Sequence, residues 1–138
     1  MSKVITGLAL GLVLLGGCSK ASKTDADNPY VGLDDAIRAW KTDVSAADPS
    51  CRRAPDGAKC EAFEVSCKAQ RVITPEDQGH GVTAKLVAHM SWSGYDERGA
   101  AQPVSAAAQF TKANGAWARI EAKPVNPDTC ADLLAANP

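Results

Sequence analysis

Four of the five cysteines lie in the part of the chain that has the pattern of a folded domain, and they limit the folds open to it. An even number of cysteines in a small exported domain is typical of a disulfide framework. A structural zinc site is the alternative, but zinc sites use closely spaced cysteines and nearby histidines, which this sequence lacks. The sequence therefore predicts two disulfides, no metal and no cofactor; the disulfide residues are Cys51, Cys60, Cys67 and Cys130.

Residues 1–17 have the layout of a secretory signal peptide. Lys3 makes the start positive, residues 4–15 form an apolar run, and the small residues Gly16 and Gly17 follow. The run is shorter than the roughly 20 residues that a membrane-spanning helix needs. We therefore expect the segment to be removed rather than retained in a membrane.

The four residues Leu15-Gly16-Gly17-Cys18 resemble the lipobox of bacterial lipoproteins. The resemblance implies that the Cys18 sulfur receives a diacylglycerol, that cleavage occurs just before it, and that the new amino group is acylated. By the same resemblance, Ser19 after the cysteine implies the outer membrane, on its periplasmic face. The alternative is an ordinary cleaved signal peptide with an incidental cysteine.

The remaining chain divides into a short polar segment and one domain. Residues 18–30 are polar and aperiodic, which predicts a lipidated flexible tether, and residues 31–138 are long enough for a single domain. Because Lys3 is the one charged residue of the leader, the mature chain carries 14 basic and 16 acidic side chains. No basic stripe with interleaved aromatic residues is present, so we expect no nucleic acid among the partners.

The apolar spacing changes along the domain. From Leu33 to Ala47 it follows one face of an α-helix, and Asp48-Pro49 ends that helix. Residues 49–60 are expected to form a loop. From Glu61 the period becomes two, which predicts a strand with one apolar face; its members are Phe63, Val65, Cys67 and Ala69.

Three further strands follow. Apolar and polar residues alternate over residues 82–93, with only Val87 out of phase, which predicts a second strand. Residues 94–103 are expected to form a loop, and a third strand is expected to begin at Val104. A three-residue hairpin loop at 113–115 then leads into a strand over 116–123. That loop length places Ala118 and Ile120 on the core face and Trp117 opposite, whereas a two-residue loop reverses the phase. A short helix over 128–136 is expected to end the chain.

This order of elements predicts an α+β fold: an N-terminal helix packed on a four-stranded antiparallel sheet, with a short C-terminal helix and two disulfides. The hairpin "FTKANGAWARI" and the helix-then-sheet order resemble the cystatin-like and nuclear transport factor two-like superfold. The resemblance implies a helix nested in a curved sheet. The chain lacks the several N-terminal helices of the second family.

The cysteine pairing can be narrowed from strand geometry. Cys60 and Cys67 lie seven residues apart, which is roughly 23 Å along a strand, and a disulfide needs Cα atoms within about 7 Å. Two arrangements remain: Cys51–Cys60 with Cys67–Cys130, or Cys51–Cys67 with Cys60–Cys130. We favour the first, because Cys67 is predicted to share the core face of its strand and Cys60 lies beside the loop that carries Cys51.

No catalytic constellation is recognisable, so we predict that the protein is not an enzyme and name no catalytic residue. His80 and His89 are interpreted as surface histidines. The stretch "SWSGYDERG" is the best binding candidate, because Trp92, Tyr95 and Arg98 lie beside a charged loop. Trp92 also falls in phase with the apolar positions of its predicted strand, which would place it in the core.

The functional expectation is a membrane-anchored periplasmic module that acts by binding an envelope protein or a small ligand. An inhibitor of a periplasmic hydrolase is one version. The alternative is a small pocket enzyme or ligand carrier of the nuclear transport factor two-like type, using the concave face of the sheet and His89.

Overall fold

The computed structural model describes residues 28–133. The predicted signal peptide, Cys18 and most of the predicted tether therefore lie outside the described residues. The elements, in chain order, are α1 (Leu33–Ala47), α2 (Pro49–Arg52), β1 (Glu61–Gln70), α3 (Pro75–Gly79), β2 (Val82–Tyr95), β3 (Ala101–Ala113) and β4 (Ala116–Glu121).

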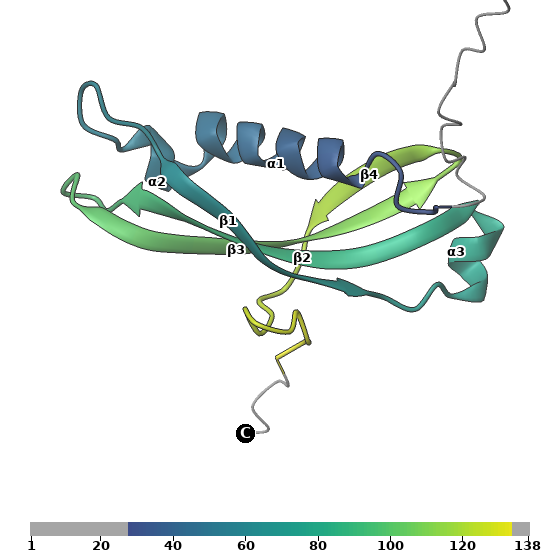
Figure 1. Ribbon diagram of the computed structural model, residues 1–138. Helices are drawn as coiled ribbons and strands as arrows, with labels where there is room; N and C mark the ends of the chain where they lie inside the picture. The colour runs from purple at the N-terminus through teal and green to yellow at the C-terminus, as the bar shows by residue number, and fades with distance from the viewer. Residues whose placement is uncertain (1–27, 134–138) are drawn as a thin grey trace, which may run out of the picture.

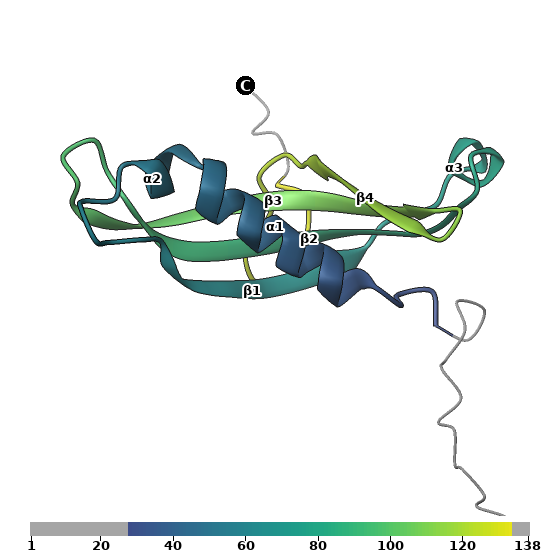
Figure 2. The same ribbon diagram turned by 90° about the horizontal axis from the view of Figure 1, so that it is seen from above.

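The strands form one antiparallel sheet with the order β1-β2-β3-β4 (Figure 1). Each strand pairs with the next one along the chain, as hairpins do. Helix α1 runs obliquely across one face of this sheet (Figure 2). The predicted α+β class, with four antiparallel strands and two disulfides, is confirmed.

The main core lies between α1 and the sheet. The Trp40 ring meets the Phe110 ring edge to face, with 5.7 Å between centroids. Met90 and Phe110 are 1% and 0% exposed, so the space under the helix is filled by side chains. The Trp92 indole stacks on Phe63 in the same core, with 5.8 Å between centroids.

The predicted loop over 49–60 begins with a short helix instead. Asp48 is extended, and its carboxylate accepts hydrogen bonds from the backbone N–H and the hydroxyl of Ser50. Pro49 occupies the first position of α2, where its missing N–H costs nothing. A cap and a proline at the first position are together enough to form this single turn.

The expectation that Phe63, Val65, Cys67 and Ala69 share one face of the first strand is wrong. Phe63 and Val65 pack into the core beneath α1, whereas Cys67 and Ala69 pack into a second cluster on the opposite face. This cluster also contains Val87, which explains why that residue is out of phase in its own strand.

A β-bulge causes the change of face. Val65 pairs with Met90 and Cys67 pairs with His89, so Ser66 is an additional residue between two consecutive positions of β2. One inserted residue moves every later side chain to the other face of the sheet. A second register shift separates Glu61 from Glu64.

The predicted loop between the second and third strands is too long. Only residues 96–100 form the turn, because β2 extends to Tyr95 and β3 starts at Ala101. The Asp96 carboxylate accepts from the backbone N–H groups of Arg98 and Ala100. The Asp96 N–H also donates to the Ala100 carbonyl, which closes the turn.

The hairpin between β3 and β4 has a two-residue loop. Ala113 pairs with Ala116, and Asn114 and Gly115 both have positive φ, 51° and 80°. This is the turn that asparagine followed by glycine favours. The expectation that Ala118 and Ile120 face the core is therefore wrong, and Ile120 is 61% exposed.

The predicted C-terminal helix is absent over residues 128–133, and residues 134–136 lie outside the described residues. The Asn126 side chain accepts from the backbone N–H groups of Asp128 and Thr129, which stabilises a turn rather than a helix. Cys130 has a φ of 56°. A single bridge then joins Val125 to Asp132.

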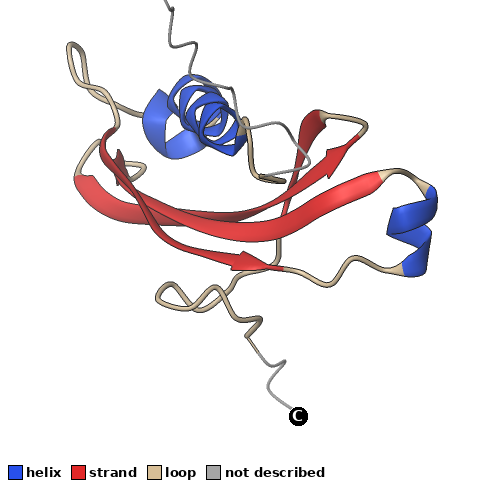
Figure 3. Cartoon of the chain, turned by 45° about the vertical axis from the view of Figure 1, so that its right-hand side comes forward, coloured by secondary structure: helices blue, strands red, loops and turns tan. Residues whose placement is uncertain are grey.

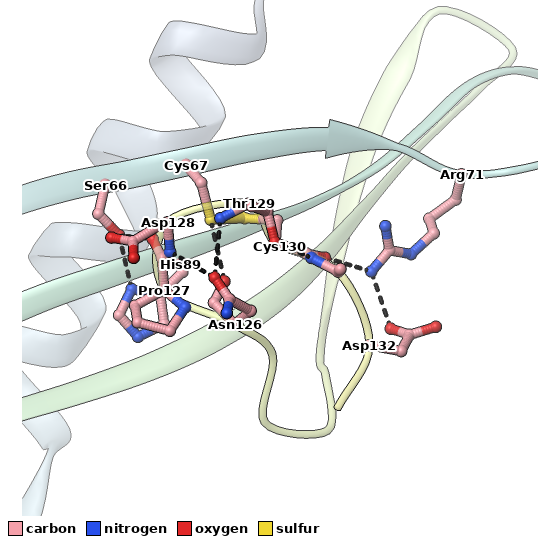
Figure 4. The surroundings of a disulfide bond; sticks show 11 residues. Ser66, Cys67, Arg71, His89, Asn126, Pro127, Asp128, Thr129, Cys130 and Asp132 are labelled. Atoms are coloured by element: carbon pink, nitrogen blue, oxygen red, sulfur yellow. Dashed lines mark hydrogen bonds and ion pairs between the residues drawn. A yellow bond between two sulfur atoms is a disulfide. The ribbon is translucent and has the colours of Figure 1, made fainter. Parts of the chain in front are cut away.

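Both disulfides have the favoured pairing. Cys51 bonds to Cys60 with a Cα separation of 5.2 Å, and Cys67 bonds to Cys130 with a Cα separation of 5.6 Å. Cys67, however, lies on the face away from α1, not on the core face that was expected for it. The second disulfide fastens the C-terminal segment to that face (Figure 4).

Candidate functional site

The three binding residues expected from the sequence do not form one surface. Trp92 is 3% exposed, and its indole N–H donates to the buried hydroxyl of Ser50. Tyr95 is half-buried and its hydroxyl donates to the Lys59 carbonyl, whereas Arg98 is exposed in the turn after β2. Trp92 therefore belongs to the core, and only Tyr95 and Arg98 lie at the end of the sheet.

The turn that carries Arg98 lies beside the loop between α2 and β1. A Cβ atom placed on Gly99 would be 3.6 Å from Pro55 Cγ, and Tyr95 reaches across to Lys59 in that loop. Figure 1 shows both connections at one end of the sheet, on the left, whereas α3 and the β3–β4 hairpin lie at the other end. The molecule thus has two distinct ends.

The two histidines differ from the expectation that both are on the surface. His80 is exposed at the end of α3, but His89 is 8% exposed. His89 Nδ1 lies 2.7 Å from Ser66 Oγ, and that hydroxyl donates to the Pro127 carbonyl over 2.7 Å (Figure 4). Because the side-chain contact between Ser66 and His89 depends on the bulge in β1, the sequence contained no signal for it.

The contact between Ser66 and His89 is not that of an activated nucleophile. The single hydroxyl proton of Ser66 points to Pro127, so the hydroxyl accepts from His89 Nδ1–H. A nucleophilic serine instead gives its proton to the histidine. The arrangement therefore holds the C-terminal segment against the sheet, as does Arg71, which donates to the Cys130 carbonyl and to Asp132.

An open groove of about 590 Å³ runs between α1 and β3, beyond the point where β4 ends. Trp40, Val44 and Ala47 line it from α1, residues 105–108 line it from β3, and His89 and Pro124 reach it from the other face. The sequence did not predict this groove, because it exists only where β3 extends beyond the end of the shorter strand β4.

The charged side chains of the groove are mainly acidic. Asp43 Oδ2 lies 3.0 Å from Arg119 Nη2, so these two charges offset each other. Asp48 and Glu121 also line the groove. Among the described residues no cation is within ion-pair distance of either carboxylate. The groove therefore has a local charge that favours a cation.

Within residues 28–133, no group of three or more histidine, cysteine or acidic side chains is placed to hold a metal ion. No helix in the same range combines the length and the apolar character needed to cross a membrane. Comparison with protein-family models, with curated proteins and with solved structures gives no match to this chain.

Proposed function

We propose that this protein is a bacterial lipoprotein, anchored through Cys18 at the periplasmic face of the outer membrane, which acts by binding a partner in the cell envelope. The lipobox resemblance at residues 15–18 carries the anchoring part of the proposal. Burying acyl methylene groups contributes about 0.8 kcal/mol each, so two or three chains anchor a protein stably to a bilayer.

The place where the described domain begins supports an outward-facing end. Nine residues separate Cys18 from Asn28, where the described domain begins. The Val31 carbonyl accepts from Trp117 and Lys112, which fixes the start of the domain to the β3–β4 hairpin. The turn with Arg98 lies at the opposite end of the sheet (Figure 1). A lipid at Cys18 would leave this turn directed away from the bilayer.

The filled core supports binding over catalysis. Trp40, Met90 and Phe110 occupy the space between α1 and the sheet, where the alternative function would need a pocket. The Ser66 hydroxyl gives its one proton to the Pro127 carbonyl, so that proton is not donated to His89, which lies at the same distance. A rigid domain with two disulfides and a projecting Arg98 suits an inhibitor of a periplasmic hydrolase. The resemblance to the cystatin-like superfold is part of the same proposal.

The alternative is a ligand carrier or small enzyme of the nuclear transport factor two-like type. One observation favours it: His89 lines the groove of about 590 Å³ together with Glu121 and Asp48. This function requires a small molecule to occupy the groove, and saturable small-molecule binding that is abolished by His89→Ala would support it over the binding module.

Intact-mass measurement of membrane fractions tests the anchor. The full chain, produced in a bacterium with two membranes, should yield a product that begins at Cys18 and carries the added mass of a diacylglycerol and an acyl chain. Cys18→Ala should abolish both cleavage and lipid addition. As a matched control, Ser19→Asp should keep the lipid but move the protein to the inner membrane. An unmodified thiol at Cys18, or a product free in solution, would contradict the proposal.

A photo-crosslinking amino acid tests the binding surface in the same cells. Placed at Arg98, it should give a discrete crosslinked envelope protein; placed at Glu76, on α3 at the tether end, it should not. Equal crosslinking from both positions, or none from Arg98, would count against an outward-facing binding end.

A further inference from the structure

The edge of β3 is only half covered. β4 pairs with residues 108–113 of β3, and β3 itself begins at Ala101. Over residues 101–106, β2 is the one strand that pairs with β3 within the described chain. Half of a long strand therefore lacks the neighbour that the other half has.

Some backbone groups of this half point outward. The Ala107 carbonyl accepts a hydrogen bond from the Ala122 N–H, so it points to the side of β4. Because backbone groups alternate along a strand, Ser105, Pro103 and Ala101 direct theirs to that same side. Pro103 has no N–H, and the outward donors are thus those of Ser105 and Ala101.

The space beside residues 101–106 of β3 is not filled by the segment that follows β4. After Glu121 the chain leaves the sheet edge and crosses to the opposite face, where Val125 is buried in the second cluster (Figure 3). The groove of about 590 Å³ occupies the space beside residues 105–108, with Val44 and Ala47 of α1 as its other wall. A strand there would continue the line of β4 and lie under the end of α1.

The opposite edge of the sheet differs from this one. β1 has two register shifts and carries Glu61, Glu64 and Lys68, and such bulges and charges prevent the addition of a strand. Residues 101–106 have no charged side chain, and their one protecting feature is Pro103. Of these two edges, that of β3 is therefore the better suited to accept a strand.

We propose that residues 101–106 of β3 bind an extended, basic peptide segment of a partner protein. This segment pairs with β3 beyond the point where β4 ends. Main-chain hydrogen bonds to Ser105 and the adjacent carbonyls supply the pairing. Asp48 and Glu121 favour a lysine or arginine in the segment, because Arg119 is already paired with Asp43. The inference rests on the proposed binding function and names its site and the chemistry of its partner.

Selection of displayed random nonapeptides on the full chain in mild detergent tests the site. We expect enriched peptides with alternating aliphatic residues and at least one lysine or arginine. Ser105→Pro removes an outward N–H without touching the ladder to β2, and it should weaken the selected peptides by roughly tenfold or more. Ser105→Val keeps the N–H and should bind as the wild type does. Binding should also slow hydrogen exchange at the Ser105 amide.

A charge reversal tests the preference for basic segments. Glu121→Lys should weaken the peptides by roughly fivefold or more, whereas Glu64→Lys on the distant β1 edge should leave binding unchanged. Thermal melting of each variant shows whether it is folded. If Ser105→Pro alone fails to fold, Glu121→Lys and the exchange of the Ser105 amide still decide the question.

The outcomes separate this inference from the proposed function. If Arg98→Glu weakens peptide binding and Ser105→Pro does not, the edge site is wrong and the proposed binding function still stands. Three other results would also overturn the edge site. They are failure to select any peptide, enrichment of acidic peptides, and self-association of the chain in sedimentation that is lost in Ser105→Pro. The lipid anchor is measured independently by the mass at Cys18.

Discussion

The indole N–H of Trp117 donates a hydrogen bond of 2.9 Å to the carbonyl oxygen of Val31. The buried ammonium group of Lys112 donates to the same oxygen over 3.1 Å and lies 5.8 Å from the centre of the Trp117 ring. The first residues of the domain are thereby fastened to the last hairpin of the sheet. This contact exists only because the two-residue loop turns Trp117 toward α1.

Trp117→Phe should keep most of the ring packing and lose the hydrogen bond. We expect the free energy of unfolding to fall by about 1 kcal/mol, with faster hydrogen exchange at residues 31–33. Denaturant unfolding and exchange mass spectrometry measure the two effects. Ile120→Thr, on the exposed face of the same strand, is the control and should change neither. Equal effects from both substitutions would show that the Val31 contact is not specific.

Gly94→Ala should destabilise the contact between α2 and β2. An added Cβ would lie 2.6 Å from Ser50 Oγ and 2.8 Å from Ser50 Cβ, and Ser50 is 5% exposed and accepts from the Trp92 indole. We expect a loss of about 1–3 kcal/mol and a changed tryptophan fluorescence. Gly79→Ala provides the matched control, since apart from the adjacent residues and the backbone of its own helix no atom lies within 4 Å of its added Cβ. Similar melting temperatures for the two variants would refute this packing.

Removal of the disulfide with the longer loop should cost more stability. Cys67 and Cys130 are 63 residues apart, against 9 for Cys51 and Cys60. Chain-entropy estimates give about 4 kcal/mol for the first and about 3 kcal/mol for the second. Paired serine substitutions, Cys67→Ser with Cys130→Ser and Cys51→Ser with Cys60→Ser, avoid mispaired thiols. Chemical unfolding under oxidising conditions should rank them in this order, and an unchanged midpoint in the first pair would be the contrary result.

The carboxylate of Asp77 should make folding sensitive to acid. Its hydrogen bond to Lys85, with help from the Thr74 backbone N–H, lowers its pKa from 3.8 to about 2. In the unfolded chain this group takes up a proton near pH 4, but in the folded protein it does so only near pH 2. Its contribution to stability is therefore complete above the unfolded pKa and is lost as the pH falls from about 4 to about 2.

Unfolding measured across this pH range checks the prediction. The stability difference between the wild type and Asp77→Asn should be constant near neutral pH and should shrink between pH 4 and 2. Lys85→Met removes the largest cause of the lowered Asp77 pKa. The stability of this variant should therefore change less than that of the wild type between pH 4 and 2. Glu76→Gln, next to Asp77 but with no ion pair in the described residues, is the control. A difference that grows on acidification would contradict the assignment.

Much of the fold could be predicted from local pattern. The spacing from Leu33 to Ala47 predicts a helix, and α1 has those bounds. Alternation predicts the strands, although it missed the ends of β2 and β3, where the carboxylate of Asp96 tightens the turn. Of the candidate site, only Tyr95 and Arg98 could be found in this way. The groove and the Ser66–His89 contact depend on residues far apart in the chain.

Local sequence patterns were enough to predict helix α1, the order of the four strands after it and the exclusion of a Cys60–Cys67 disulfide, because each of these follows from a few consecutive residues. The face that each residue occupies after Ser66 and after Asn114 could be read only from the folded protein. One residue more or fewer in a bulge or a hairpin loop reverses every later side chain, and packing across the whole sheet selects between the two. The same physics leaves half of β3 without a partner strand.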